Sequence, residues 1–118
     1  MIGLDTNVIV RLFVDDDPNQ VEAARRFIAS RCSRDNPGFI DRVALCELIW
    51  VLASVHGYRR EEIADVIERL LESRDMRLED DDLVRAALQD YRATSVDFAD
   101  ILIGEVNQIG RASCRERV

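Results

Sequence analysis

The 118-residue chain has no long apolar run, and no stretch approaches the roughly 20 residues that span a bilayer. Its first residues carry no basic segment and include Asp5, so they are not typical of a secretion signal. Cysteine is scarce: Cys32, Cys46 and Cys114 form an odd set without metal-ligand spacing. These absences predict a cytoplasmic protein with reduced thiols and no membrane partner.

The chain also lacks an excess of positive charge. Sixteen basic residues stand against 23 acidic ones, for a formal net charge of −7. Bulk charge therefore does not favour non-specific binding to nucleic acid. An acidic chain can still act on nucleic acid if its carboxylates hold a divalent cation that meets the phosphate. The single histidine, His56, stands beside Gly57 at a predicted helix end, and we assign it no catalytic role.

The periodicity of apolar residues predicts an α/β fold. The length suffices for one domain with a core, and the apolar fraction of 47% is ordinary for a globular protein. Short apolar runs predict strands at residues 2–4, 39–40 and 76–78. Longer patterns predict helices at residues 8–14, 18–31, 43–55 and 60–72, with a further helix opened by Asp80, Asp81 and Asp82.

Asp5 ends the first apolar run, just before a predicted helix. A carboxylate at the carboxyl end of a central strand lies where open α/β sheets place their chemistry. The alternative is that Asp5 caps the helix and does nothing more. This segment alone does not separate the two interpretations.

The segment Val43–Val55 is too long for a strand and apolar on every side, which predicts a buried helix with Asp41 as its cap. Glu47 is its only charged residue. A lone ionised carboxylate in a buried helix is costly unless something compensates it. Arg42 or another arginine could form a structural ion pair with it, or a metal ion could bind there. Because no cation lies at helical spacing from Glu47, we favour the functional interpretation.

Asp97 and Asp100 lie three residues apart at the start of an apolar helix, so both carboxylates share one helix face. The alternative is that Asp97 caps the helix and Asp100 interacts with the helix dipole. Taken alone, this pair favours the capping interpretation.

Taken together, Asp5, Glu47, Asp97 and Asp100 suggest a shared site. Carboxylates that converge on one cleft repel one another unless a cation neutralises them. Hard oxygen ligands select Mg²⁺ or Mn²⁺. Such an ion can hold a phosphodiester, activate a water molecule and stabilise the charge that develops on the phosphate.

These segments resemble the motifs of PIN-domain ribonucleases, and specifically of the VapC toxins of type II toxin–antitoxin pairs. The resemblance covers residues 1 to about 108 and lies in three segments: Leu4-Asp5-Thr6-Asn7-Val8, Glu47-Leu48-Ile49-Trp50-Val51-Leu52 and Asp97-Phe98-Ala99-Asp100-Ile101-Leu102-Ile103. It implies a PIN-like fold, in which helices flank a short parallel sheet. It also implies a Mg²⁺-dependent endoribonuclease that cleaves RNA phosphodiester bonds.

The resemblance assigns a role to each motif residue. It implies that Asp5, Glu47 and Asp100 bind the metal and that Asp97 occupies an extra acidic position beside the third ligand. Thr6 matches the hydroxyl position that flanks the first carboxylate. Members of this toxin family usually form homodimers, and a small partner, the VapB antitoxin, holds them inactive.

The resemblance ends near residue 108, where the family would continue with more helix and further strands. Residues 109–118 read Ile-Gly-Arg-Ala-Ser-Cys-Arg-Glu-Arg-Val and equal the translation of a common sequencing-adapter read. We therefore expect residues 1–108 to form a PIN domain that lacks its C-terminal strands, and residues 109–118 to be non-native. The first strand would then lie at a sheet edge, and we expect the chain to fold poorly alone and to cut RNA weakly or not at all.

Two other functions fit parts of the pattern. A phosphatase with an aspartyl nucleophile would use Asp5, but that class usually has a second aspartate two residues later, where this chain has Asn7. A truncated, inactive fragment that only binds the antitoxin is the non-enzymatic alternative.

Overall fold

The computed structural model describes residues 2–14 and 17–105. It divides the chain into two compact units, Met1–Glu79 and Asp80–Val118. Each unit is described below by itself. The segment 109–118, which we expect to be non-native, lies outside the described residues.

The first unit contains a three-stranded parallel sheet. Strand β1 (Ile2–Gly3) pairs with β2 (Gly38–Ile40), and β2 pairs with β3 (Met76–Leu78), in the order β1-β2-β3. The register aligns Gly3 with Phe39, and Phe39 with Arg77. Among the described residues β1 pairs with β2 alone, so it forms one edge of the sheet. The short parallel sheet and its connecting helices confirm the predicted α/β, PIN-like architecture.

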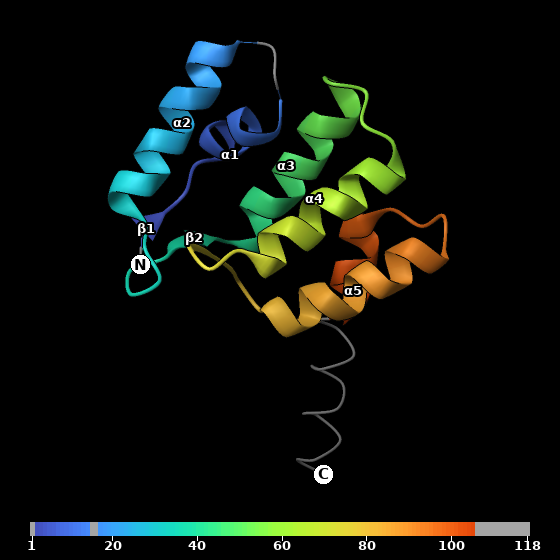
Figure 1. Cartoon of the computed structure of the whole chain (residues 1–118). Coiled ribbons are helices and arrows are strands. Elements are labelled where there is room, and N and C mark those ends of the chain that lie inside the picture. Colours follow the sequence, from blue (N-terminus) through green and yellow to red (C-terminus); the bar gives the residue numbers. More distant parts are fainter. Residues whose placement is uncertain (1, 15–16, 106–118) are drawn as a thin grey trace. The chain divides into compact units, whose positions relative to one another are not determined.

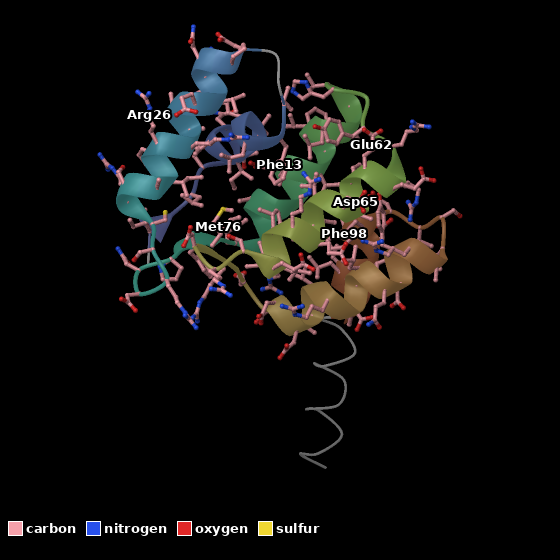
Figure 2. The ribbon with its side chains drawn as sticks, in the orientation of Figure 1. Phe13, Arg26, Glu62, Asp65, Met76 and Phe98 are labelled. Carbon is pink, nitrogen blue, oxygen red and sulfur yellow. The ribbon has the colours of Figure 1, made fainter. Side chains whose placement is uncertain are left out.

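Four helices connect the strands of the first unit: α1 (Thr6–Phe13), α2 (Pro18–Arg31), α3 (Arg42–Ser54) and α4 (Arg60–Glu72). Figure 1 shows α1 beside α2, α3 beside α1, and α4 beside α3. The polar residues of α2 face away from these contacts, and Figure 2 shows Arg26 on its outer side. Parallel strands need such crossover helices, which explains why helix and strand alternate along the chain.

Aspartates fix the starts of three of these helices. The side chains of Asp5, Asp17 and Asp41 each accept a hydrogen bond from a backbone N–H in the first turn of α1, α2 and α3. An aspartate in this position satisfies an N–H group that has no partner within the helix. The predicted cap Asp41 is thus confirmed. Pro18 occupies the first turn of α2, a position that suits its fixed φ and its missing N–H.

The core of the first unit is aliphatic. Its fully buried side chains come from one strand and three helices: Ile9, Ile40, Leu45, Leu48, Leu52, Ile67 and Leu70. Gly38 allows a close approach at the edge of this core. A Cβ at Gly38 would lie 2.6 Å from Leu4 Cδ1 and 3.0 Å from Cys32 Sγ, so a side chain there would displace its neighbours. The same burial, together with the nearby Asp75 carboxylate, raises the pKa of the Cys32 thiol.

Helix α3 is only half buried, which differs from the expectation of a helix covered on every side. Leu45, Leu48, Ile49 and Leu52 are buried, but Val43 is 69% exposed and Trp50 is 64% exposed. The sequence of α3 shows which of its positions are apolar. It did not show which of them another element covers.

The second unit contains α5 (Asp81–Ala93) and a helical segment over residues 98–105. The rings of Tyr91 and Phe98 meet edge to face, with centroids 5.6 Å apart. A side-chain hydrogen bond between Asp90 and Glu105 also joins the two segments, and it raises the pKa of Glu105. Asp80 precedes α5 with φ of 51°, in the left-handed region that aspartate tolerates better than most residues.

None of the helices in the described part of the chain combines the length and the apolar character that crossing a bilayer requires.

Candidate functional site

Asp5 stands at the carboxyl end of β1, where the chain enters α1. Its Oδ1 accepts a hydrogen bond from the backbone N–H of Asn7 at 3.3 Å, and the residue remains exposed. Asp5 therefore does cap α1, as the capping interpretation predicted. An exposed carboxylate that caps a helix still presents its charge to solvent, so capping does not exclude a second role.

Thr6 connects the first motif to the second. Its hydroxyl donates a hydrogen bond to Oε2 of Glu47 at 3.1 Å, across 41 positions of sequence. Thr6 is 8% exposed, and it is the buried polar residue of the described core. This bond joins α1 to α3, which pack against each other. Thr6, the residue beside Asp5, thus holds the carboxylate of Glu47, the acidic residue of the apolar helix.

Glu47 itself is exposed, so the burial cost that its apolar neighbours suggested does not arise. Arg42, the cation considered as its structural partner, forms its ion pair with Glu79, with Nε and Oε2 3.1 Å apart. The backbone N–H of Arg42 also donates to that oxygen at 3.4 Å. This pair fastens the start of α3 to the end of β3. It leaves Thr6 as the partner that orients Glu47 within the first unit.

Asp97 and Asp100 belong to the second unit, and both are exposed. Asp97 directly precedes the helical segment, and its carbonyl accepts the N–H of Ile101 at 3.1 Å. This is the position that a capping residue occupies, as the alternative interpretation expected. Asp100 lies one turn further along the same segment.

The structure therefore brings the first two motifs together and describes the third in a separate unit. Among residues 2–14 and 17–105, no group of three or more His, Cys, Asp and Glu side chains is arranged to hold a metal ion. The predicted metal ligands in the first unit are the carboxylates of Asp5 and Glu47, and the hydroxyl of Thr6 lies beside them. All are hard oxygens of the kind that Mg²⁺ and Mn²⁺ prefer, so their chemistry fits such an ion.

Sequence reasoning missed the exposed apolar neighbours of Glu47. Val43, Glu47 and Trp50 stand at helical positions i, i+4 and i+7 of α3, which places them on one face, and all three are exposed. The spacing was present in the sequence. It was not recognised as an exposed face, because an apolar helix was expected to be buried on every side.

Comparison with known proteins identifies the family. The family model described as the PIN domain matches residues 2–112, which is nearly the whole chain, so the chain belongs to the PIN-domain family. Members of this family are generally nucleases that use divalent metal ions such as Mg²⁺ or Mn²⁺.

A further comparison is more distant. The α subunit of ATP synthase from Cupriavidus metallidurans is 28% identical over 60 residues, which is 51% of this chain and 12% of that protein. The chain thus spans a small part of the curated relative that it matches, and the likeness carries no functional argument. No solved structure matches the chain.

Proposed function

We propose that this PIN-domain chain derives from a Mg²⁺- or Mn²⁺-dependent endoribonuclease of the VapC toxin type. The observation that carries the proposal is the hydrogen bond from Thr6 to Glu47, which joins two of the three predicted motifs. Membership of the PIN-domain family supports a nuclease that works with a divalent metal. We propose that Asp97 and Asp100 supply further carboxylate ligands.

The chain's own residues have distinct tasks in this proposal. Asp5 and Glu47 provide negatively charged oxygens that would hold the cation. Thr6 orients the side chain of Glu47 by donating a hydrogen bond to its carboxylate. When bound, the ion supplies charge stabilisation at the scissile phosphate and lowers the pKa of a water molecule. The cap made by Asp5 holds its carboxylate at the end of β1, so its position does not depend on the metal.

The toxin assignment brings expectations beyond the nuclease. We propose that the intact protein acts in the cytoplasm, forms a homodimer and binds a VapB-like antitoxin that suppresses cleavage. A small neighbouring gene that encodes a DNA-binding segment and a helical tail would support this pairing. Purification of the chain together with that gene product tests the pairing directly.

The nuclease proposal is tested by cleavage of labelled RNA with Mg²⁺ and with a chelator. In the intact protein, substitution Asp5→Asn should lower the cleavage rate by more than about a hundredfold, because removal of a direct metal ligand should cost more than removal of a supporting group. Asparagine caps helices as well as aspartate does, so the fold should survive. The free energy of unfolding, from urea titration, checks this point.

Asp17→Asn is the matched control. Asp17 caps α2 in the same way, with Oδ1 3.0 Å from the N–H of Asn19, but lies in none of the three motifs. It should retain full activity. Cleavage that Asp5→Asn leaves intact would remove Asp5 from the mechanism. A phosphoenzyme trapped on Asp5 would instead indicate the phosphatase, and a chain that binds antitoxin without any cleavage would indicate the inactive fragment.

A further inference from the structure

Helix α1 is too short to hold its own position. It has eight residues, and an isolated helix of that length is marginal in water. Thr6, in its first turn, donates the hydrogen bond that orients Glu47. The geometry of the candidate site therefore depends on the contacts that hold α1 against the rest of the first unit.

Tyr58 provides such a contact at the far end of α1. Its hydroxyl donates a hydrogen bond to the carbonyl of Phe13, the last residue of the helix, at 2.7 Å and across 45 positions of sequence. Figure 2 labels Phe13. The last carbonyls of a helix have no partner within it, so this bond satisfies a group that would otherwise need water. Both residues are half-buried, which limits competition from solvent.

The backbone of Tyr58 is in turn anchored to α3. Its N–H donates to the carbonyl of Leu52 at 2.9 Å, and the side chain of Leu52 is fully buried. Gly57 makes this turn possible, because its φ of 68° lies in the left-handed region that favours glycine. Tyr58 thus joins the end of α3 to the end of α1.

A hydrogen bond at each end therefore ties α1 to α3 and to the turn that follows it. Thr6 donates to Glu47 at the site end, and Phe13 accepts from Tyr58 at the other. The two ends lie about 10 Å apart, because a helix rises by about 1.5 Å per residue. A helix held at one end can pivot about that point, whereas a helix held at both ends keeps its first turn in place.

We propose that Tyr58 is a positioning residue that acts through α1 to hold the Thr6 hydroxyl against Glu47. Tyr58 lies at the opposite end of α1 from the site, so it acts on Glu47 through the helix. The consequence for metal binding rests on the proposed function, in which Glu47 is a ligand. Loss of the Tyr58 hydroxyl should loosen the bond between Thr6 and Glu47 and weaken the binding of Mn²⁺.

Tyr58→Phe tests this role, because it removes the hydroxyl and keeps the ring. Titration calorimetry of the full chain with Mn²⁺ should show an affinity about fivefold lower, a smaller loss than removal of a direct partner of the ligand causes. In the Thr6→Val background the same substitution should cause no further loss, since Tyr58 acts through the Thr6 hydroxyl. A purely structural role would lower the urea midpoint and leave the Mn²⁺ affinity of the folded chain unchanged.

Amide hydrogen exchange measures the same coupling without metal. The N–H of Ile9 bonds to the carbonyl of Asp5 at the site end of α1, and the N–H of Val14 bonds to the helix at its other end. Tyr58→Phe should speed exchange at both N–H groups, because α1 is then free to pivot.

Ser30→Ala is the matched control. The Ser30 hydroxyl also donates to a backbone carbonyl near a helix end, that of Phe27 at 3.0 Å, but α2 carries none of the site residues. This substitution should change neither the Mn²⁺ affinity nor the exchange of the α1 amides.

Three results would overturn the inference. The first is a Tyr58→Phe chain that binds Mn²⁺ as tightly as the parent while Asp5→Asn binds it less tightly. The second is a full additional loss in the Thr6→Val background, and the third is faster exchange at Val14 without any change at Ile9. Faster exchange at Ile9, with an Mn²⁺ affinity that Asp5→Asn leaves unchanged, would support the role of Tyr58 and reject the proposed metal site.

Discussion

The two units of the chain hold their acidic residues by different means. In the first unit Asp5 accepts a local backbone hydrogen bond as the cap of α1, and Glu47 accepts a hydrogen bond from the Thr6 hydroxyl on another helix. In the second unit the exposed Asp97 and Asp100 lie at the start of a helical segment. A side chain held by its own fold is positioned before any ligand arrives.

The largest effect on the first unit should come from Gly38→Ala. The new Cβ would lie 2.9 Å from Leu4 Cγ and 3.0 Å from Cys32 Sγ, so the side chains of Leu4 and Cys32 must shift. We expect the free energy of unfolding to fall by about 1–3 kcal/mol, as measured by urea titration.

Gly3→Ala is its control, since a Cβ at Gly3 meets no atom within 4 Å. It should change the stability by less than about 0.5 kcal/mol. Equal unfolding midpoints for the two variants would contradict the close packing at Gly38.

A smaller and more local effect should follow from Thr6→Val, which keeps the shape of the side chain and removes its hydroxyl. Without that donor Glu47 loses its fixed orientation, and we expect the cleavage rate to fall by about tenfold. Cleavage of labelled RNA at saturating Mg²⁺ gives the rate. Thr6→Ser keeps the donor and should retain most of the activity, whereas a fully active Thr6→Val would show that the bond is only structural.

The smallest effect concerns the second unit and its response to pH. The hydrogen bond with Asp90 raises the pKa of Glu105, because it favours the protonated carboxyl. The stability that this bond contributes is therefore complete below the pKa of the unfolded chain and is lost as the pH rises through the folded-state pKa.

Glu105→Gln replaces the acid by a permanent donor and should remove this pH dependence. The pair is largely solvated, so the gain at neutral pH should not exceed about 0.5 kcal/mol. Thermal unfolding at pH 3 to 8 measures it, and the exposed Glu72→Gln is the control. A pH profile that Glu105→Gln leaves unchanged would exclude the bond as its source.

Local patterns in the sequence predicted much of the fold. The bounds of α2, α4 and β3 agree with the sequence interpretation, because caps, proline and apolar periodicity act within a few residues. The partner of Glu47 was not predictable in this way. Thr6 lies 41 positions away, and the bond exists only because β1 and β2 bring α1 and α3 together.

The exposure of Trp50 was missed for a related reason. An apolar helix is covered where other elements pack on it, and the sequence of that helix does not reveal which of its faces they reach. The roles proposed for Asp97 and Asp100 rest on the family resemblance, since their spacing alone favours a helix cap.

We propose that acids from distant parts of the chain bind one divalent ion. Titration calorimetry with Mn²⁺ on the parent chain, Asp5→Asn, Asp100→Asn and the double variant tests it most directly. Each single substitution should weaken Mn²⁺ binding by more than about tenfold, and the double variant should lose less than the sum of the two. Additive losses, or an affinity that Asp100→Asn leaves unchanged, would contradict a shared ion.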